Sequence, residues 1–152
     1  MLKIGDKIPD FQGKDQDGKI IKYSDYKGKK LIIYFYPKAN TPGCIAEGCN
    51  LRNNYQILQK EGYEIIGISK DTIDKQKTFH EKYSFPFPLI ADVDKKIIES
   101  FGAWGMKKFM GKEFEGILRY TFIVDENGII TNIITKVKTK SHAEQILEKN
   151  DH

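Results

Sequence analysis

The chain has 152 residues, of which 39% are hydrophobic, 30% charged and 12% aromatic, a profile typical of one soluble globular domain and unlike that of a disordered or fibrous chain. No apolar run approaches the ~18 residues of a transmembrane helix, and the charged N-terminal segment lacks the apolar core of a secretory signal. We therefore expect a single domain over residues 1–152 in the cytoplasm, with no membrane partner. The net charge of +4 comes from scattered lysines with acids between them, and only Arg52 and Arg119 are arginines, so nucleic-acid binding is not favoured.

Strands and helices are predicted to alternate along the chain. Continuous apolar runs predict strands at 31–36 and 63–69 that are buried on both faces of a sheet. Shorter strands are predicted at 19–23, 89–91, 120–124 and 129–137. Helices are predicted at 42–60, 72–83 and 95–101, and from Ser141, which opens a capping box. The stretch 103–116 has no clean period and is predicted to be an irregular loop. This order predicts an α/β sandwich with a mixed central β-sheet flanked by helices.

The two cysteines, Cys44 and Cys49, are the strongest candidates for chemically reactive residues. Thr41 is a natural N-cap, and Pro42 then occupies the first helical position, where its missing N–H costs nothing. Cys44 consequently lies in the first turn, where unpaired backbone N–H groups and the positive end of the helix dipole favour a thiolate. A strand, a loop and a helix meet here, and open α/β sheets carry their sites at such junctions.

The spacing of the cysteines argues against a structural disulfide. In one unbroken helix over 42–60 they would be ~7.5 Å apart along the axis and ~140° apart around it, which places their Cα atoms about 8.6 Å apart. Disulfides require less than roughly 6.8 Å. A bond between them therefore needs the first turns of the helix to unwind, which Gly43 and Gly48 would help. We interpret the two cysteines as a redox pair whose disulfide formation is coupled to local unfolding of the helix.

Two charged residues could act on Cys44. Arg119 lies at the start of a predicted strand, and the sequence leaves two interpretations open: a donor for the reacting group or a surface partner of a carboxylate. Glu47 is on the same helix face as Cys44, three residues later. We expect it to be an ordinary acidic residue of the first helical turn, with hydrogen bonding as the alternative role.

Other uses of the thiols have less support. A metal site needs about four ligands, and His80, His142 and His152 lack matching spacing, so no metal or cofactor is expected. We expect His142, in a helix cap, and the terminal His152 to be solvated. Two inert buried cysteines remain an alternative, although the Thr-Pro-Gly sequence before Cys44 does not fit it.

Residues 35–44 (FYPKANTPGC), followed by Glu47 and Cys49, closely resemble the active-site segment of peroxiredoxins, most of all the bacterioferritin comigratory protein (PrxQ-type) subfamily. The family pattern Pro-x-x-x-Thr/Ser-x-x-Cys is met in full. Similarity extends over nearly the whole chain, through residues 5–11, 87–92 and 119–128. The combination is specific to the family, and it implies a thioredoxin-like fold.

The resemblance also implies a role for each site residue. Cys44 would be the peroxidatic cysteine, which attacks the O–O bond of hydrogen peroxide or an organic hydroperoxide and becomes a sulfenic acid. Thr41 and Arg119 would bind the peroxide oxygens, and Pro37 would shield the pocket from water. Cys49 would be the resolving cysteine, forming an intramolecular disulfide that thioredoxin or a similar dithiol reduces, which protects Cys44 from irreversible oxidation.

Gly43 and Glu47 are the candidate supporting residues. The chain departs from its relatives at Ala39, where a polar or acidic residue is common, and at Gly48, where alanine is common. Members of the subfamily are often monomeric, and we expect a monomer. The alternative function is a non-enzymatic thiol redox sensor or disulfide-exchange module, which would keep the same reactive cysteine.

Overall fold

A computed structural model describes residues 2–150 of the chain. Its strands are β1 (Gln12–Lys14), β2 (Ile20–Lys22), β3 (Lys30–Phe35), β4 (Tyr63–Ser69), β5 (Leu89–Ala91), β6 (Trp104–Phe109), β7 (Lys112–Ile117), β8 (Thr121–Val124) and β9 (Ile130–Ile134). Its helices are α1 (Pro42–Asn53), α2 (Tyr55–Lys60), α3 (Ile73–Tyr83), α4 (Lys96–Ser100) and α5 (His142–Asn150), with short 3-10 turns η1 (Tyr23–Tyr26) and η2 (Thr139–Ser141).

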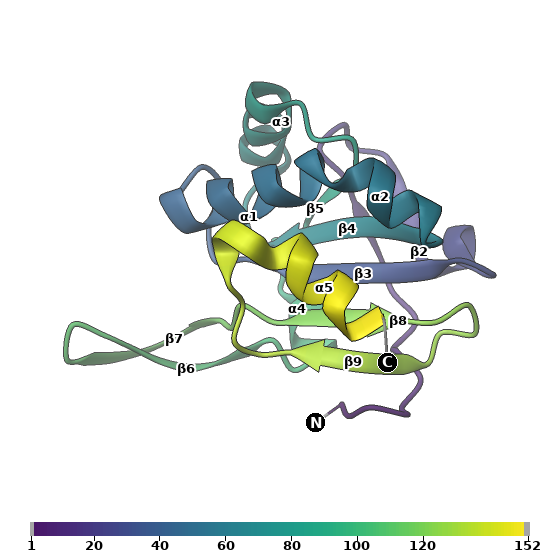
Figure 1. The fold of residues 1–152 in the computed structure, drawn as a ribbon. Helices are drawn as coiled ribbons and strands as arrows, with labels where there is room; N and C mark the ends of the chain where they lie inside the picture. The colour runs from purple at the N-terminus through teal and green to yellow at the C-terminus, as the bar shows by residue number, and fades with distance from the viewer. Residues whose placement is uncertain (1, 151–152) are drawn as a thin grey trace.

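Within the described residues, seven strands form one mixed sheet in the order β2-β1-β5-β4-β3-β8-β9 (Figure 1). The central strand β3 pairs in parallel with β4 and antiparallel with β8. The predicted α/β sandwich with a mixed sheet is confirmed.

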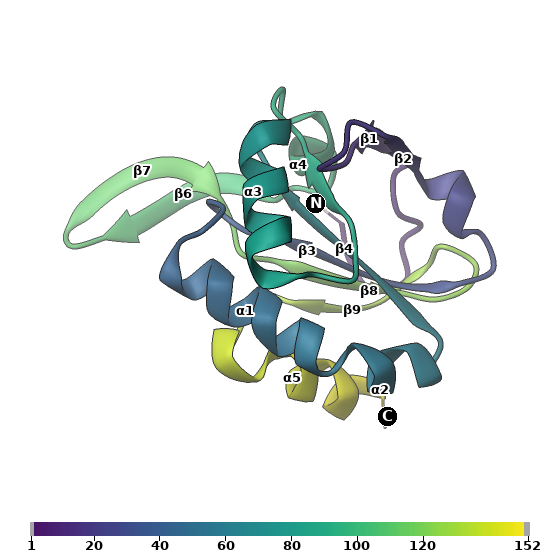
Figure 2. The ribbon, with the colours of Figure 1, turned by 90° about the horizontal axis from the view of Figure 1, so that it is seen from above.

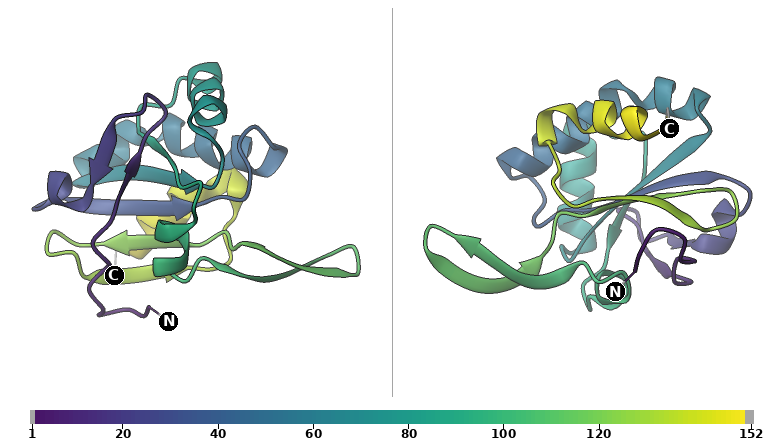
Figure 3. Two further views of the ribbon diagram at one scale, coloured as in Figure 1. Left: turned by 180° about the vertical axis from the view of Figure 1, so that it is seen from behind. Right: turned by 60° about the horizontal axis from the view of Figure 1, so that its bottom comes forward.

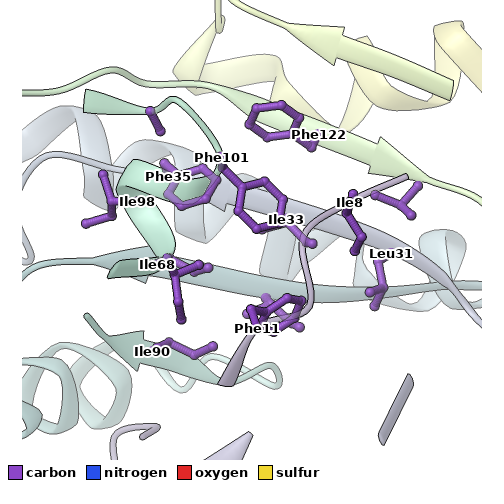
Figure 4. Close-up of a cluster of buried hydrophobic side chains, with 14 of the residues drawn as sticks. Ile8, Phe11, Leu31, Ile33, Phe35, Ile68, Ile90, Ile98, Phe101 and Phe122 are labelled. Carbon is purple, nitrogen blue, oxygen red and sulfur yellow. The ribbon is translucent and has the colours of Figure 1, made fainter. Parts of the chain in front are cut away.

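Alternate side chains of β3 supply two hydrophobic cores, one on each face of the sheet. Leu31, Ile33 and Phe35 pack with the N-terminal segment and α4, and Figure 4 shows this cluster around Phe101 and Phe122. Ile32 and Tyr34 point to the opposite face. Helices α1, α2 and α5 cover that second face, as seen from above in Figure 2, and α3 contributes Phe79 to the same core. Because both faces are covered, β3 carries the continuous apolar run from which it was predicted.

The segment predicted to be an irregular loop is instead a β-hairpin, β6–β7, which projects away from the body of the protein (Figure 3). Phe109 pairs with Lys112, so Met110 and Gly111 form a two-residue turn, and both have positive φ, 52° and 78°. The sequence of such a turn is usually Asn-Gly or Asp-Gly, and here Met110 stands in place of the Asn or Asp, so the turn was not predicted. Both faces of the outer part of the hairpin are exposed, so the apolar–polar alternation of a half-buried strand is also missing.

Two helix predictions are corrected as well. The predicted helix over 42–60 divides at Asn54 into α1 and α2. Ser141 belongs to η2, and α5 begins at His142. The backbone N–H of Ala143, in the first turn of α5, donates a hydrogen bond to the side chain of Asn50 on α1 at 2.7 Å. Residues 2–150 include no helix with the length and hydropathy needed to cross a membrane.

Candidate active site

Cys44 lies in the first turn of α1, as predicted, and its side chain is buried. Thr41 occupies the N-cap position with an extended backbone and Pro42 follows as the first helical residue. The Thr41 hydroxyl does not cap the helix, because it donates a hydrogen bond to Lys38 O at 2.7 Å. The hydroxyl therefore faces the loop that leads into the helix, and its oxygen stays free to act as an acceptor.

Arg119 connects the two acidic groups of the site. Its Nη2 donates to Cys44 Sγ at 3.4 Å, and its Nη1 donates to Glu47 Oε1 at 2.8 Å. The arginine is held between β7 and β8, and the carbonyl of the next residue, Tyr120, accepts a hydrogen bond from Phe35 N. The carboxylate that pairs with Arg119 is therefore buried rather than on the surface, and the donor role toward the reacting group stays a prediction. Arg119 contacts the thiol and pairs with a carboxylate.

Gly43 leaves the space that Arg119 uses. A Cβ atom at this position would lie 3.2 Å from Arg119 Nη2, tighter than most contacts in folded proteins. Any larger residue would press on the guanidinium that contacts Cys44. Gly43 therefore allows the close approach of the Arg119 guanidinium to the start of α1.

Glu47 is not an ordinary first-turn acid, because it lies beyond the first turn of α1 and its side chain is completely buried. Burial raises its pKa to about 7, although the Arg119 guanidinium acts in the opposite direction. Within residues 2–150, Glu47 Oε2 and the hydroxyl of Tyr34 are the buried side-chain oxygens or nitrogens that lack a hydrogen-bond partner. One carboxyl oxygen of Glu47 thus accepts a hydrogen bond from Arg119, and the other oxygen is buried without one.

His142 also differs from the prediction, since it is buried rather than solvated. Its Nε2 lies 2.8 Å from Thr121 Oγ1 and 3.5 Å from Glu47 Oε2. Burial lowers its pKa to about 4. His142 lies on the buried face of α5 together with Ala143 and Ile146, and this spacing was the signal that could have identified it.

Cys49 lies on the same unbroken helix and is half-buried, and both cysteines carry free thiols. Gly48, just before it, packs tightly. A Cβ atom there would lie 2.7 Å and 2.9 Å from ring atoms of Phe85. The helical form of α1 therefore keeps the two sulfurs unbonded, as the spacing predicted.

The loop before α1 and the β6–β7 hairpin border the site. Pro37 follows the buried Tyr36 at the end of β3 and is half-buried, and Ala39 N donates to Asp71 at 2.8 Å. Lys107 of β6 interacts electrostatically with the site. Burial, and next the Arg119 guanidinium, lower its pKa, whereas charge on Cys44 acts in the opposite direction. Lys107 is thus a second positive charge that interacts with Cys44, besides Arg119.

A buried thiol at a helix N-terminus, with a guanidinium against its sulfur, places the protein among thiol-dependent redox enzymes with a thioredoxin-like fold. Residues 4–133 match the model of the AhpC/TSA family, and the chain belongs to that family.

Relatives and solved structures narrow the assignment. Peroxiredoxin Bcp of Escherichia coli K12 is 42% identical over 146 residues, which are 96% of this chain and 94% of the relative. Peroxiredoxin Bcp of Bacillus subtilis 168 is 42% identical over 147 residues, 97% of this chain and 94% of the relative.

Among solved structures, a mutant of Xylella fastidiosa PrxQ has a TM-score of 0.92 at 28% identity, covering 99% of this chain and 96% of that one. The structure of Xanthomonas campestris bacterioferritin comigratory protein, studied for its alkyl peroxide reduction activity, has a TM-score of 0.86 at 31% identity. The match covers 93% of this chain and 90% of that one. The resemblance predicted from the active-site segment is confirmed, and the chain is a thiol peroxidase of the peroxiredoxin type.

Proposed function

We propose that Cys44 is the peroxidatic cysteine and that it reduces hydrogen peroxide and organic hydroperoxides. The observation that carries the proposal is the 3.4 Å contact between Cys44 Sγ and Arg119 Nη2 at the start of α1. The thiolate attacks one peroxide oxygen, the O–O bond breaks, and sulfur is oxidised to the sulfenic acid while the leaving oxygen takes a proton and departs as water or alcohol. Alkyl peroxide reduction by the Xanthomonas campestris relative supports the organic substrates.

Thr41, Arg119 and Pro37 have distinct roles in this step. The guanidinium binds the peroxide and stabilises the negative charge that develops on the leaving oxygen. The Thr41 hydroxyl, whose hydrogen is engaged by Lys38 O, accepts a hydrogen bond from the peroxide O–H. Pro37 shields the pocket from bulk water, which strengthens these electrostatic contacts.

Cys49 is the proposed resolving cysteine. Its thiol condenses with the sulfenic acid of Cys44, an S–S bond forms, and water leaves. The reaction requires α1 to unwind between the two residues, because an intact helix holds the Cα atoms about 8.6 Å apart. A thioredoxin-type dithiol then reduces the disulfide and becomes oxidised itself. We propose that the protein acts as a monomer in the cytoplasm.

The test is consumption of hydrogen peroxide and of an alkyl hydroperoxide, coupled to thioredoxin and its reductase. Wild-type protein should turn over repeatedly, and Cys44→Ser should abolish turnover. Cys49→Ser should form the first sulfenic acid at the normal rate but regenerate slowly. Turnover in Cys44→Ser would contradict the assignment of the nucleophile, and full turnover in Cys49→Ser would contradict the resolving role. Stoichiometric oxidation of the wild type without turnover would instead favour a redox sensor.

A further inference from the structure

Arg119 is the single guanidinium shared by two acidic groups at the site. Its two terminal nitrogens donate to Cys44 Sγ and to Glu47 Oε1, and the Glu47 side chain has no exposed surface. If the thiol and the carboxyl were both ionised, this contact would hold two negative charges against one positive charge away from water. An uncompensated buried charge is costly, and buried groups avoid it by holding a proton.

Hydrogen bonds around His142 fix where its ring proton lies. Gln145 Oε1 accepts from Lys138 N at 2.8 Å, and Gln145 Nε2 donates to Lys136 O at 3.0 Å, so the orientation of the amide is determined. The same Oε1 lies 3.0 Å from His142 Nδ1, and an oxygen acceptor requires Nδ1 to carry the proton. The neutral ring therefore has a bare Nε2, to which the Thr121 hydroxyl donates.

That bare nitrogen faces the second oxygen of Glu47, Oε2, at 3.5 Å. An ionised carboxylate would direct lone pairs at the lone pair of Nε2, with no hydrogen bond to Oε2 from any described residue. A protonated carboxyl sets no negative charge against that lone pair, which already accepts from the Thr121 hydroxyl. The ring orientation therefore favours the neutral form of Glu47.

The remaining groups around Glu47 agree with this assignment. Tyr34 on β3 contributes a buried neutral hydroxyl, and Cys44 on α1 contributes negative charge when ionised. Arg119 supplies positive charge directly to Glu47, and Lys107 on β6 supplies positive charge that acts on Cys44. Burial raises the pKa of Glu47 to about 7 even against Arg119, and a thiolate competing for the same guanidinium acts further in that direction.

We propose that Glu47, held by Arg119 and His142, stores the proton that completes peroxide reduction. The proposal rests on Cys44 being the peroxidatic cysteine. The thiolate of Cys44 attacks the peroxide, the S–O bond forms and the O–O bond breaks. The proton of Glu47 passes to the leaving oxygen, which departs as water or alcohol, and the Glu47 carboxylate then has Arg119 to itself because the sulfur is neutral.

The proton returns when the disulfide is reduced. The external dithiol gives up two electrons, and Cys44 is released as a thiol. Its proton moves to the Glu47 carboxylate, which restores the thiolate and the neutral carboxyl. Glu47 is thus the catalytic proton reservoir in this cycle, and His142 is a positioning residue that acts through it.

The first test is the ring tautomer of His142 in the reduced wild-type protein. Nitrogen-15 spectra of the histidine rings should show Nδ1 protonated and Nε2 bare, with the signals assigned from His142→Gln and His80→Gln. A proton on Nε2 would give ionised Glu47 a donor and would overturn the proposal.

The second test counts protons at pH 7 in a Cys49→Ser background, in which the reaction stops at the sulfenic acid. Hydrogen peroxide is added in stoichiometric amount, and proton uptake from a weakly buffered solution is followed with an indicator dye. With Glu47 present, we expect clearly less than one proton taken up per sulfenic acid trapped, because the protein supplies part of the proton. With Glu47→Gln, a neutral isosteric replacement, we expect about one proton taken up per sulfenic acid trapped.

Equal uptake in the two proteins would overturn the reservoir role while leaving the peroxidase assignment intact. Absence of a trapped sulfenic acid in both proteins would instead contradict the assignment of Cys44. The two failures are therefore distinguishable in one experiment.

Discussion

Glu47→Gln and His142→Asn should change the pH dependence of stability in opposite directions. Burial raises the pKa of Glu47 from 4.5 to about 7 and lowers that of His142 from 6.5 to about 4. Each difference corresponds to about 3 kcal/mol of folding free energy, because one pKa unit is worth about 1.4 kcal/mol.

The signs follow from which state binds more protons. Between pH 4.5 and about 7 the folded protein keeps a proton on Glu47 that the unfolded chain releases, so this residue lowers stability as the pH rises. Between about pH 4 and 6.5 the unfolded chain binds a proton on His142 that the folded protein does not, so this residue raises stability as the pH rises. The two contributions nearly cancel in the wild type over their shared range.

Each variant should reveal the contribution of the other residue. As the pH rises from 4.5 to 7, the free energy of unfolding of Glu47→Gln should increase by roughly 3 kcal/mol relative to that of the wild type. As the pH rises from 4 to 6.5, that of His142→Asn should decrease by roughly 3 kcal/mol relative to the wild type. Urea unfolding under reducing conditions at several pH values measures the free energies of unfolding. Ile65→Val, a buried substitution in the same core cluster, serves as control and should cost about 1 kcal/mol at every pH. Differences that stay constant with pH in all three variants would refute the reasoning.

Three further substitutions test other parts of the structure. Arg119→Met removes the donor to Cys44 and should slow its oxidation by hydrogen peroxide roughly 100-fold in stopped-flow experiments; an unchanged rate would exclude the guanidinium from the chemistry. Gly48→Ala must displace the ring of Phe85 and should destabilise the protein by about 1 kcal/mol in urea, whereas a gain would show that helix propensity prevails. Met110→Asn suits the positive φ of the hairpin turn and should stabilise by up to about 1 kcal/mol; a loss would mean that the methionine packs usefully.

Local sequence predicted the parts of the fold whose cause is local. The strands at 31–36 and 63–69 were found within one residue, because burial on both faces leaves a continuous apolar run. The start of α1 was found because Thr41 and Pro42 determine it. The β6–β7 hairpin was missed because its turn lacks the usual residues.

Two site residues were misjudged because their environment is tertiary. In the sequence, Glu47 resembles any acidic residue near a helix start, and only the fold brings Arg119, 72 positions later, against it. His142 resembles a cap residue until α5 packs on α1 and buries it. The family pattern predicts roles for Cys44, Thr41 and Arg119, but it does not indicate the burial of Glu47 and His142 behind them.

The position of Glu47 between the two cysteines connects its burial to disulfide formation. The unwinding of α1 proposed for disulfide formation would take Glu47 out of its buried contact and into water, where its carboxyl would ionise at its usual pKa. The roughly 3 kcal/mol that ionised Glu47 costs the folded helix above pH 7 therefore favours the unwound form by about 100-fold relative to acid conditions.

Formation of the bond between Cys44 and Cys49 should consequently accelerate as the pH rises through 7, beyond the effect of Cys49 ionisation that both proteins share. Glu47→Gln should lack this extra acceleration, and the two proteins should converge at acid pH. Quenching with a thiol-alkylating reagent at intervals after a peroxide pulse measures the rate. A ratio of the wild-type and Glu47→Gln rates of disulfide formation that did not change with pH would contradict this reasoning. It would mean that unwinding does not release the free energy spent on burying ionised Glu47, so that the helix opens while Glu47 stays in place.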